Sequence, residues 1–417
     1  MPTVASLFSG AGGMDLGFKS AGFEIIYAND FDKHACATYR ENIGDHIVEA
    51  SIEDIDVSTI PDCDVMIGGP PCQGFSVAGK MSLEDERSQL VYNFADIVLE
   101  KKPRAFVMEN VDHLGKSPRF KLTRDSLRKL FEKYYFVQDG ILVASDFGVP
   151  QRRRRYFMVG LLKTEIENQS TEPFLPIPNG KIAPTSRDIL LSFPPPGQEG
   201  NERTINAKIT LAASPVMRKS PYSGMLFNGL GRPVDLNRPI QTLAATFGGN
   251  KTPVVDEREL RNGEDPWIVD YHSKLNNGMQ AVFKEGPDFL RRLTVDECIV
   301  FQDFPRNYVL HGPKSAMFRQ IGNAVPPGLA RVIAKQILKI LESLKIVLDW
   351  SAKVKSQHRS PNKKFRRGRG FSLAELKEPG IELWQAKKKG VRIDKRRRRA
   401  NPVNVDLLRK LQTSTHN

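Results

Sequence analysis

Short apolar runs alternate with stretches of helical periodicity along residues 1–163. Helical spacing is clearest over residues 87–101 and 121–133. The runs that predict β-strands cover residues 4–8, 24–28, 65–67, 105–108, 141–144 and 156–161. Because alternating strands and helices are typical of a doubly wound sheet, we predict an α/β fold with a mostly parallel sheet for this part of the chain.

Between residues 164 and 236 the pattern changes. Pro, Ser and Asn become frequent and hydrophobic periodicity is weak, which is typical of connecting segments. Order returns at residues 238–243, and helical patterns follow over residues 294–302 and from Gly328 to about Leu348. We therefore expect a loop-rich insertion or small domain, followed by helices.

The end of the chain differs from the rest in charge. Residues 351–417 contain 20 Lys and Arg but 5 Asp and Glu, a net charge of +15, which leaves −1 for the first 350 residues. A polar, basic linker over residues 351–369 precedes a short amphipathic unit over residues 371–411. Such a tail attracts phosphate backbones through counterion release, without reading sequence. This favours contact with nucleic acid over a solvated charge run that only aids solubility.

Length and composition limit the class of protein. The 417 residues, 40% hydrophobic and 26% charged, suffice for two or three domains of ordinary soluble composition. No apolar run approaches the roughly 20 residues of a membrane helix, and residues 1–8 look like a first strand rather than a signal peptide. The cysteines show no C-x-x-C spacing, which argues against a zinc site or a disulfide framework. They are Cys36, Cys63, Cys72 and Cys298. A reduced, cytoplasmic compartment fits this usage.

The most informative motif is Gly68-Gly69-Pro70-Pro71-Cys72-Gln73-Gly74-Phe75-Ser76, directly after an apolar strand-like run. Two prolines fix successive φ angles and the glycines permit close backbone approach. The thiol of Cys72 is thus presented on a rigid turn at a strand end, where open α/β sheets bind ligands. A buried structural cysteine is the usual alternative, but this setting favours a nucleophile.

A glycine-rich segment, Phe8-Ser9-Gly10-Ala11-Gly12-Gly13-Met14-Asp15, follows the first predicted strand. Glycines at a strand-to-helix turn let a nucleotide-like ligand approach the backbone. A G-x-G-x-x-G dinucleotide motif would need glycine where Asp15 stands, so NAD is disfavoured. At the end of the second strand, Asp30 can accept hydrogen bonds from ribose hydroxyls and Phe31 can stack on an adenine.

Two further groups fall near Cys72 in the predicted sheet. Glu109-Asn110 follows the strand over residues 105–108, so it shares the sheet edge of Cys72. In the run Gln151-Arg152-Arg153-Arg154-Arg155 the alternate members Gln151, Arg153 and Arg155 share one face of a strand. A surface turn and a basic patch are the alternatives for these two groups.

The Cys72 run resembles the nucleophile motif of the DNA (cytosine-5)-methyltransferases, and other blocks agree in the family's order. The block Arg319-Gln320-Ile321-Gly322-Asn323-Ala324-Val325-Pro326-Pro327 resembles the family's last motif. The resemblance spans about residues 1–348. It implies a catalytic and cofactor-binding domain at 1–163, completed by 320–348, with a target-recognition domain at 164–319 and a basic nucleic-acid-binding tail at 349–417.

The resemblance also implies S-adenosyl-L-methionine as cofactor, without a metal. Its binding residues would be Phe8, Ser9, Gly10, Gly12, Gly13, Asp30, Phe31, Ser51, Ile52, Pro70, Leu90, Asn323 and Val325. Ser51 aligns where the family tends to place an aspartate near the adenine amino group, and Glu53 or Asp54 is the alternative contact.

By the same resemblance, Cys72 would add to carbon 6 of a flipped cytosine and make carbon 5 nucleophilic. Glu109 would protonate N3, and an arginine would stabilise charge at O2, with Arg155 favoured over Arg153. Gln151, on the same face of the strand, is a further catalytic candidate. The predicted DNA contacts are Gln73, Ser76, Lys80 and Arg87. The expected partners are double-stranded DNA and a cognate restriction endonuclease, for a monomeric, cytoplasmic, nucleoid-associated enzyme.

Two rival functions share these motifs. A transfer-RNA cytosine methyltransferase would carry a Cys-Phe-Thr signature, but no cysteine lies between Cys72 and Cys298, and Cys298 is followed by Ile-Val. A non-catalytic nucleic-acid-binding protein would not need Cys72, Glu109 and Arg155 together.

The tail has its own resemblance, to a large-subunit ribosomal protein over about 45 residues. Within it, Ser372 and Glu375 form a predicted capping box. A small helical nucleic-acid-binding module is implied, and a disordered basic tail is the alternative.

Overall fold

The computed structural model describes residues 1–71, 86–165, 173–178 and 180–352, and short stretches between 355 and 408. The chain forms two compact units, residues Met1–Gln336 and Ile337–Asn417. Among the described helices, none has the length and apolar character needed to cross a bilayer.

A seven-stranded sheet organises the first unit, with the order β3-β2-β1-β4-β5-β8-β6. The strands are β1 (Thr3–Leu7), β2 (Glu24–Asp30), β3 (Ile47–Glu49), β4 (Val65–Gly68), β5 (Ala105–Val111), β6 (Tyr135–Val143) and β8 (Arg154–Leu162). The five strands from β3 to β5 run parallel, whereas β8 is antiparallel to both of its neighbours. The predicted mostly parallel α/β sheet is confirmed.

The six strands predicted from apolar runs are all present, and β3 is the one that the pattern missed. It has three residues, of which only Ile47 is buried, so it leaves no apolar run in the sequence. Strand β6 begins at Tyr135, earlier than predicted, because it lies at the sheet edge and most of its residues are only half-buried.

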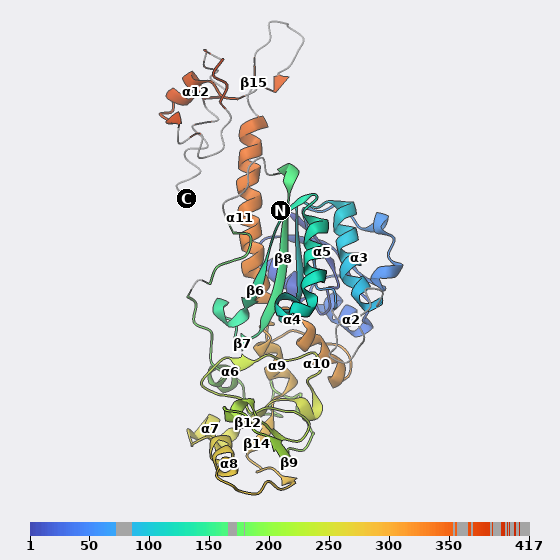
Figure 1. Ribbon diagram of the computed structural model, residues 1–417, viewed down its shortest axis with the longest axis vertical. Coiled ribbons are helices and arrows are strands. Elements are labelled where there is room, and N and C mark those ends of the chain that lie inside the picture. Colours follow the sequence, from blue (N-terminus) through green and yellow to red (C-terminus); the bar gives the residue numbers. More distant parts are fainter. Residues whose placement is uncertain are drawn as a thin grey trace. The chain divides into compact units, whose positions relative to one another are not determined.

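Helices connect these strands and cover the sheet (Figure 1). They are α1 (Gly13–Ser20), α2 (Lys33–Asn42), α3 (Glu86–Lys101), α4 (Asp112–Lys116) and α5 (Lys121–Phe131). The two helices predicted from periodicity correspond to α3 and α5. Their apolar faces join one core cluster with β1, β4 and β5, in which Phe94, Phe106 and Phe131 are completely buried. This core fixes the positions of the strand ends that carry the site.

Residues 180–323 form short elements below the sheet in the view of Figure 1. The strands are β9 (Thr210–Val216), β10 (Met225–Phe227), β11 (Ile240–Gln241), β12 (Val254–Asp256), β13 (Lys284–Glu285) and β14 (Leu290–Arg292). The helices are α6 (Ser186–Leu191), α7 (Glu257–Asn262), α8 (Trp267–Asn276), α9 (Val295–Phe301) and α10 (Lys314–Asn323). The small share of regular structure before residue 236 agrees with the loop-rich prediction.

The segment after α9 packs against the first loop of the chain. A Cβ added at Gly13 would lie 2.3 Å from the carbonyl oxygen of Val325, and one at Gly17 would lie 2.4 Å from Cβ of Ala330. The hydroxyl of Tyr308 donates to the carbonyl of Ala11 at 2.6 Å. Glycine is therefore required in α1 so that helix α11 (Pro327–Ala352) can approach it.

The second unit contains the short helix α12 (Leu373–Lys377) and the pair β15 (Lys355–Ser356) and β16 (Arg366–Arg367). The capping box of Ser372 and Glu375 is present as predicted. Glu375 also accepts a hydrogen bond from Nδ2 of Asn404 at 3.0 Å. With Phe371, Leu376 and Leu408 buried together, this part of the tail has an apolar core of its own.

Candidate active site

The turn that carries the predicted nucleophile begins where β4 ends. Nδ2 of Asn110 donates to the carbonyl oxygen of Pro70 at 3.0 Å, which ties this turn to the end of β5. Cys72, Gln73, Ser76 and Lys80 lie outside the described residues, and Arg87 is described only as part of helix α3. The polypeptide is therefore tied to β5 at Pro70, two residues before the thiol.

Glu109 lies at the same edge, near the end of β5, and is 7% exposed. A Cβ added at Gly69 would lie 3.1 Å from Oε2 of Glu109, so the carboxyl group faces the backbone three residues before Cys72. Burial raises the pKa of Glu109, and the charges of Arg155 and Arg153 oppose this shift. The result is a carboxyl group that can hold a proton closer to neutral pH than a free glutamate.

Arg155 reaches Glu109 across the antiparallel pair of β5 and β8. Val111 is opposite Arg155 in the register, so Glu109, two residues earlier, is on the same face. Nε of Arg155 lies 2.8 Å from Oε1 of Glu109, an ion pair in which both side chains are nearly buried. The structure thus brings together the two groups predicted to act on the cytosine ring.

Gln151 and Arg153 are hydrogen-bonded to segments around the site, although Nε of Arg153 has no partner among the described residues. Arg153 is 0% exposed, and its two Nη atoms donate to the carbonyls of Leu243 and Gly322 at 2.8 and 2.5 Å. Gln151 donates to Gln302 at 2.8 Å and accepts from the backbone N–H of Leu243 at 3.0 Å. The predicted alternation is present, since Gln151, Arg153 and Arg155 point inward while Arg152 and Arg154 are exposed.

These contacts make Gln151 and Arg153 supports of the site wall. They join strand β7 (Gln151–Arg152) to the segment after β11 and to the end of α10. The sequence motif did not show this role, and Gln302 and Leu243 were not among the predicted residues. The ordered block of residues 238–243 was the sequence feature that could have indicated these contacts, because it contains β11, which pairs with β7.

The glycine-rich loop between β1 and α1 has a conformation that its glycines allow. Gly10 and Gly12 have φ of 55° and 79°, and Phe8 also has a positive φ of 54°. A Cβ at Gly10 would meet no atom within 4 Å, so space is open beside the loop there. Asp30 accepts a hydrogen bond from the N–H of Gly10 at 2.8 Å, which joins the ends of β1 and β2.

The remaining predicted cofactor residues surround this loop at different depths. Phe31 is 70% exposed, an aromatic ring free to stack. Phe8, Leu90 and the buried Ile52 belong to one core cluster, and Ser51 is half-buried directly before a short helical turn, Ile52–Asp54. Asn323 is exposed at the end of α10, and Val325 packs against Gly13 through its carbonyl.

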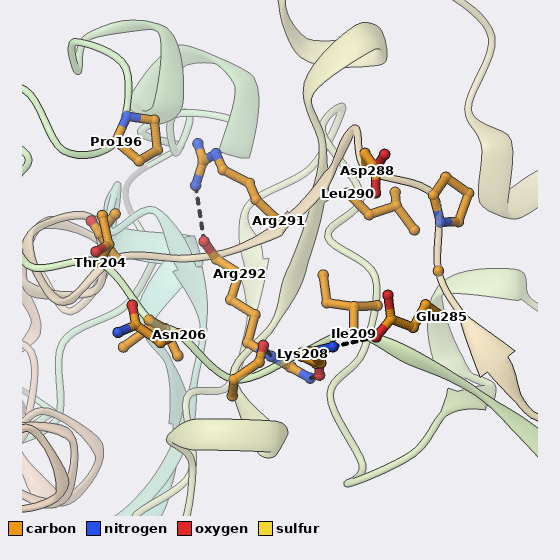
Figure 2. A pocket seen from close by; sticks show the side chains of 15 residues that line it. Pro196, Thr204, Asn206, Lys208, Ile209, Glu285, Asp288, Leu290, Arg291 and Arg292 are labelled. Atoms are coloured by element: carbon orange, nitrogen blue, oxygen red, sulfur yellow. Dashed lines mark hydrogen bonds and ion pairs between the residues drawn. The ribbon is translucent and has the colours of Figure 1, made fainter.

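Two cavities of similar size are lined by residues between Arg152 and Thr294. One, of about 330 Å³, lies between residues 204–209 and 285–294 (Figure 2). Its cations are already bound: Arg291 pairs with Glu297, Lys208 pairs with Glu285, and Arg292 donates to four backbone carbonyls. Two of these three cations are therefore neutralised by carboxylates, and the guanidinium of Arg292 is held by backbone carbonyls.

The second cavity, of about 310 Å³, adjoins the catalytic strands through β11. Its floor is apolar, with Val234, Leu243 and Phe247 buried. Three exposed cations, Arg152, Arg232 and Lys251, stand at its rim. Among the residues with described side chains, no cluster of His, Cys, Asp and Glu could hold a metal ion.

Comparisons with known proteins show the family to which the chain belongs. The family model described as C-5 cytosine-specific DNA methylase matches residues 2–339, and that of Ribosomal protein L13e matches residues 344–410. The chain is 34% identical over 359 residues to Type II methyltransferase M.NgoFVII of Neisseria gonorrhoeae, covering 81% of this chain and 87% of that protein. It is 33% identical over 345 residues to Type II methyltransferase M.MthTI of Methanothermobacter thermautotrophicus, covering 82% and 98%.

Solved structures show the same fold. A putative DNA modification methyltransferase encoded within an E. coli prophage has a TM-score of 0.59 at 24% identity, covering 82% of this chain and 100% of that one. The S. pombe Dnmt2 methyltransferase has a TM-score of 0.58 at 17% identity, covering 82% and 99%. With the family model matching most of the chain, and with relatives this similar, the protein belongs to the C-5 cytosine-specific DNA methylase family and is a DNA (cytosine-5)-methyltransferase.

Proposed function

We propose that this enzyme transfers a methyl group from S-adenosyl-L-methionine to carbon 5 of a cytosine flipped out of double-stranded DNA, through a covalent bond between Cys72 and carbon 6. The observation that carries the proposal is the position of Glu109. Its buried carboxyl group faces Gly69, on the turn that leads to Cys72, and pairs with Arg155 at 2.8 Å. An acid and a cation beside a thiol are what this chemistry needs.

The chain's own residues fit the methyl donor. Gly10 leaves open space beside the loop, Asp30 lies at its edge, and the exposed ring of Phe31 is available to an adenine. Ser51, Asn323 and Val325 complete the proposed wall. When bound, the donor supplies an electrophilic methyl group on a sulfonium. The residues around it hold it in place and exclude water.

In the proposed reaction the Cys72 thiolate adds to carbon 6 of the cytosine and the ring electrons move toward N3. The proton that Glu109 holds passes to N3, and Arg155 stabilises charge at O2. Carbon 5 then takes the methyl group as a nucleophile. Loss of the carbon 5 proton to a base, departure of the Cys72 thiolate and return of the N3 proton to Glu109 restore the aromatic ring, giving 5-methylcytosine.

Carbon 5 is inaccessible in a duplex, so the cytosine must rotate out at a cost of about a few kcal/mol. Gln73, Ser76, Lys80 and Arg87 are proposed to contact the DNA around it. The cavity with Arg152, Arg232 and Lys251 at its rim has the charge that a neighbouring DNA backbone needs. We place target recognition in residues 164–319 and catalysis in residues 1–163 and 320–348.

The biological setting is proposed from the named relatives. Two of them are Type II methyltransferases, and we propose that this enzyme likewise protects a site cut by a cognate endonuclease. It would act as a monomer on DNA in the cytoplasm, associated with the nucleoid. The basic tail of residues 349–417 would add contact with nucleic acid without reading bases.

A mechanism-trapping substrate tests the proposal. A duplex with 5-fluorocytosine at the target position cannot lose a proton from carbon 5, so the enzyme should remain linked to it and migrate as an adduct in a denaturing gel. Cys72→Ser should form no adduct while still binding DNA. Cys63→Ser, at a half-buried cysteine away from the proposed site, is the matched control and should form the adduct normally. An adduct in the Cys72→Ser variant would refute the assignment.

A further inference from the structure

A carboxyl group without a counter-charge lies behind the glycine-rich loop. Asp15 is in the first turn of α1 and is 0% exposed. Its Oδ1 accepts a hydrogen bond from the hydroxyl of Tyr39 at 2.9 Å. Its Oδ2 is buried and has no hydrogen-bond partner among the described residues. A buried carboxylate in this state costs stability, which calls for a reason.

This group is connected to the loop from two directions. The hydroxyl of Ser6 lies close enough to lower the pKa of Asp15, and Ser9, a loop residue, donates to that hydroxyl at 3.0 Å. The Tyr39 ring lies directly under Gly12, since a Cβ there would meet the ring at 3.1 Å. Charge on Asp15 is therefore placed next to the backbone that is proposed to hold the methyl donor.

A hydrogen-bonded path leads from Asp15 toward solvent. The Tyr39 hydroxyl, which donates to Asp15, lies 3.1 Å from Nε2 of the half-buried His46. With a proton on Nε2, His46 donates to Tyr39 and Tyr39 donates to Asp15. The buried carboxyl group can thus exchange a proton with its surroundings although no solvent touches it.

The charged and titratable groups around Asp15 leave it negative at neutral pH. Burial, followed by the repulsion of Asp30, raises the pKa of Asp15 to about 6. Arg319 forms its ion pair with Asp32, at 2.5 Å. Burial lowers the pKa of His46, and the charge of Lys19 lowers it further. Tyr308, also close to Asp15, donates its proton to Ala11.

We propose that Asp15 is a specificity-determining residue whose negative charge makes the site favour the cationic methyl donor over its neutral product. The inference rests on the proposed use of S-adenosyl-L-methionine. Donor and product share the adenosine, amino and carboxyl groups and differ in the sulfonium, which is positive in the donor and an uncharged thioether in the product. A buried charge in a medium of low dielectric acts on that difference alone.

Proton linkage gives the proposal a direct readout. Binding of a cation stabilises the ionised form of Asp15 and releases its proton. For a shift of about one pKa unit, from about 6 to about 5, donor affinity should rise about fivefold between pH 5 and pH 7, with release of about half a proton near pH 5.5. Product affinity should change little over the same range. Titration calorimetry in buffers of different ionisation enthalpy measures both quantities without any methyl transfer.

The test compares wild type, Asp15→Asn and Asp30→Asn. Asp15→Asn should weaken donor binding about tenfold at pH 7, leave product binding within about twofold, and remove the Asp15 share of the released proton. Asp30→Asn, at the proposed ribose contact that both ligands share, should weaken both. Because Asp15→Asn removes a buried charge, its Tm at pH 8 should rise above that of wild type, whereas a purely structural aspartate would give a lower Tm.

Tyr39→Phe is the second variant, in case Asp15→Asn does not fold. It keeps the charge but removes the hydrogen bond that stabilises it, so the midpoint of the pH dependence should move upward. Equal weakening of donor and product by Asp15→Asn, or an unmoved midpoint in Tyr39→Phe, would overturn the proposal. If wild type bound neither ligand, the proposed function itself would fail, and this inference with it.

Discussion

The two halves of the sheet edge hold buried carboxyl groups in opposite electrostatic settings. On the β4–β5–β8 side, Glu109 pairs with Arg155 at 2.8 Å and feels the charge of Arg153. On the β1–β2 side, Asp15 and Asp30 are both buried, the charge of Asp30 adds to the upward shift that burial gives the pKa of Asp15, and Asp15 forms no ion pair among the described residues. One half balances its acid with arginines and the other does not.

This difference matches what each half is proposed to handle. Negative charge develops on the cytosine ring after thiolate addition, so the first half needs a proton and a cation. The second half holds a ligand that is positive before transfer and neutral after it, so unbalanced carboxylates suit it. Transfer of the methyl group then removes both the negative charge that develops on the cytosine ring and the positive charge of the donor. The contrast indicates that the charges in each half are set by the group that it is proposed to bind, and not by the packing of the fold.

Among the substitutions considered, Glu109→Gln should have the largest effect, because it removes the acid on the β4–β5–β8 side of the site. The amide keeps the shape of the carboxyl group but cannot give a proton to N3, so adduct formation on 5-fluorocytosine DNA should slow about 10²- to 10³-fold. Single-turnover gel assays measure this rate, and donor affinity should stay unchanged. Glu49→Gln, at an exposed carboxyl group of β3 paired with Arg40, is the matched control.

The raised pKa of Glu109 also predicts the direction in which the rate of adduct formation changes with pH. Burial raises the pKa of Glu109, so the proton is present below this raised pKa and is lost as pH increases through it. The rate of adduct formation in wild type should therefore decline on the alkaline side, and Glu109→Gln should lack that decline. An identical alkaline decline in the variant would assign it to another group and leave Glu109 outside the proton transfer.

A smaller effect should follow from crowding the carboxyl group without changing its charge. Gly69→Ala places a Cβ 3.1 Å from Oε2 of Glu109, tighter than ordinary contact, so Glu109 must shift by a few tenths of an ångström. We expect about a tenfold slower adduct formation, since catalysis is sensitive to such displacements. The double variant Gly69→Ala with Glu109→Asp, which shortens the acid, should lose less than the two single changes combined. Strict additivity would show that the two residues act independently.

Much of this site could be predicted from local sequence. The apolar runs placed β4 and β5, and neighbouring strand ends brought Glu109 near the Cys72 turn. Alternation along residues 151–155 placed Arg155 inward. These inferences succeed because strand periodicity and strand ends are local properties.

The rest depends on contacts between segments far apart in the chain. The carbonyl of Gly322 accepts from Arg153 across 169 residues, and Gln302 accepts from Gln151 across 151 residues. Backbone carbonyls leave no signature in the sequence, so the buried supporting position of Arg153 could not be predicted from it. In the sequence, Asp15 serves only to disfavour a dinucleotide motif. Its contact with Tyr39 cannot be predicted there, because Tyr39 comes from the next helix. The sequence around Asp15 therefore cannot indicate that its carboxyl group lacks a positively charged partner in the fold.

The smallest effect on chemistry should come from deleting residues 353–417, which hold all of the excess positive charge. Their described part has an apolar core of its own, and none of the proposed catalytic or cofactor-binding residues belongs to this segment. Adduct formation on a short saturating duplex should therefore remain within about twofold, while the slope of log Kd against log salt becomes shallower as phosphate contacts are lost. DNA binding measured between 50 and 200 mM KCl gives that slope, and bisulfite sequencing of methylated plasmid gives the recognised site. A changed recognition site would mean that the tail reads bases. An unchanged site with a shallower slope means that its charge serves only to hold the phosphate backbone.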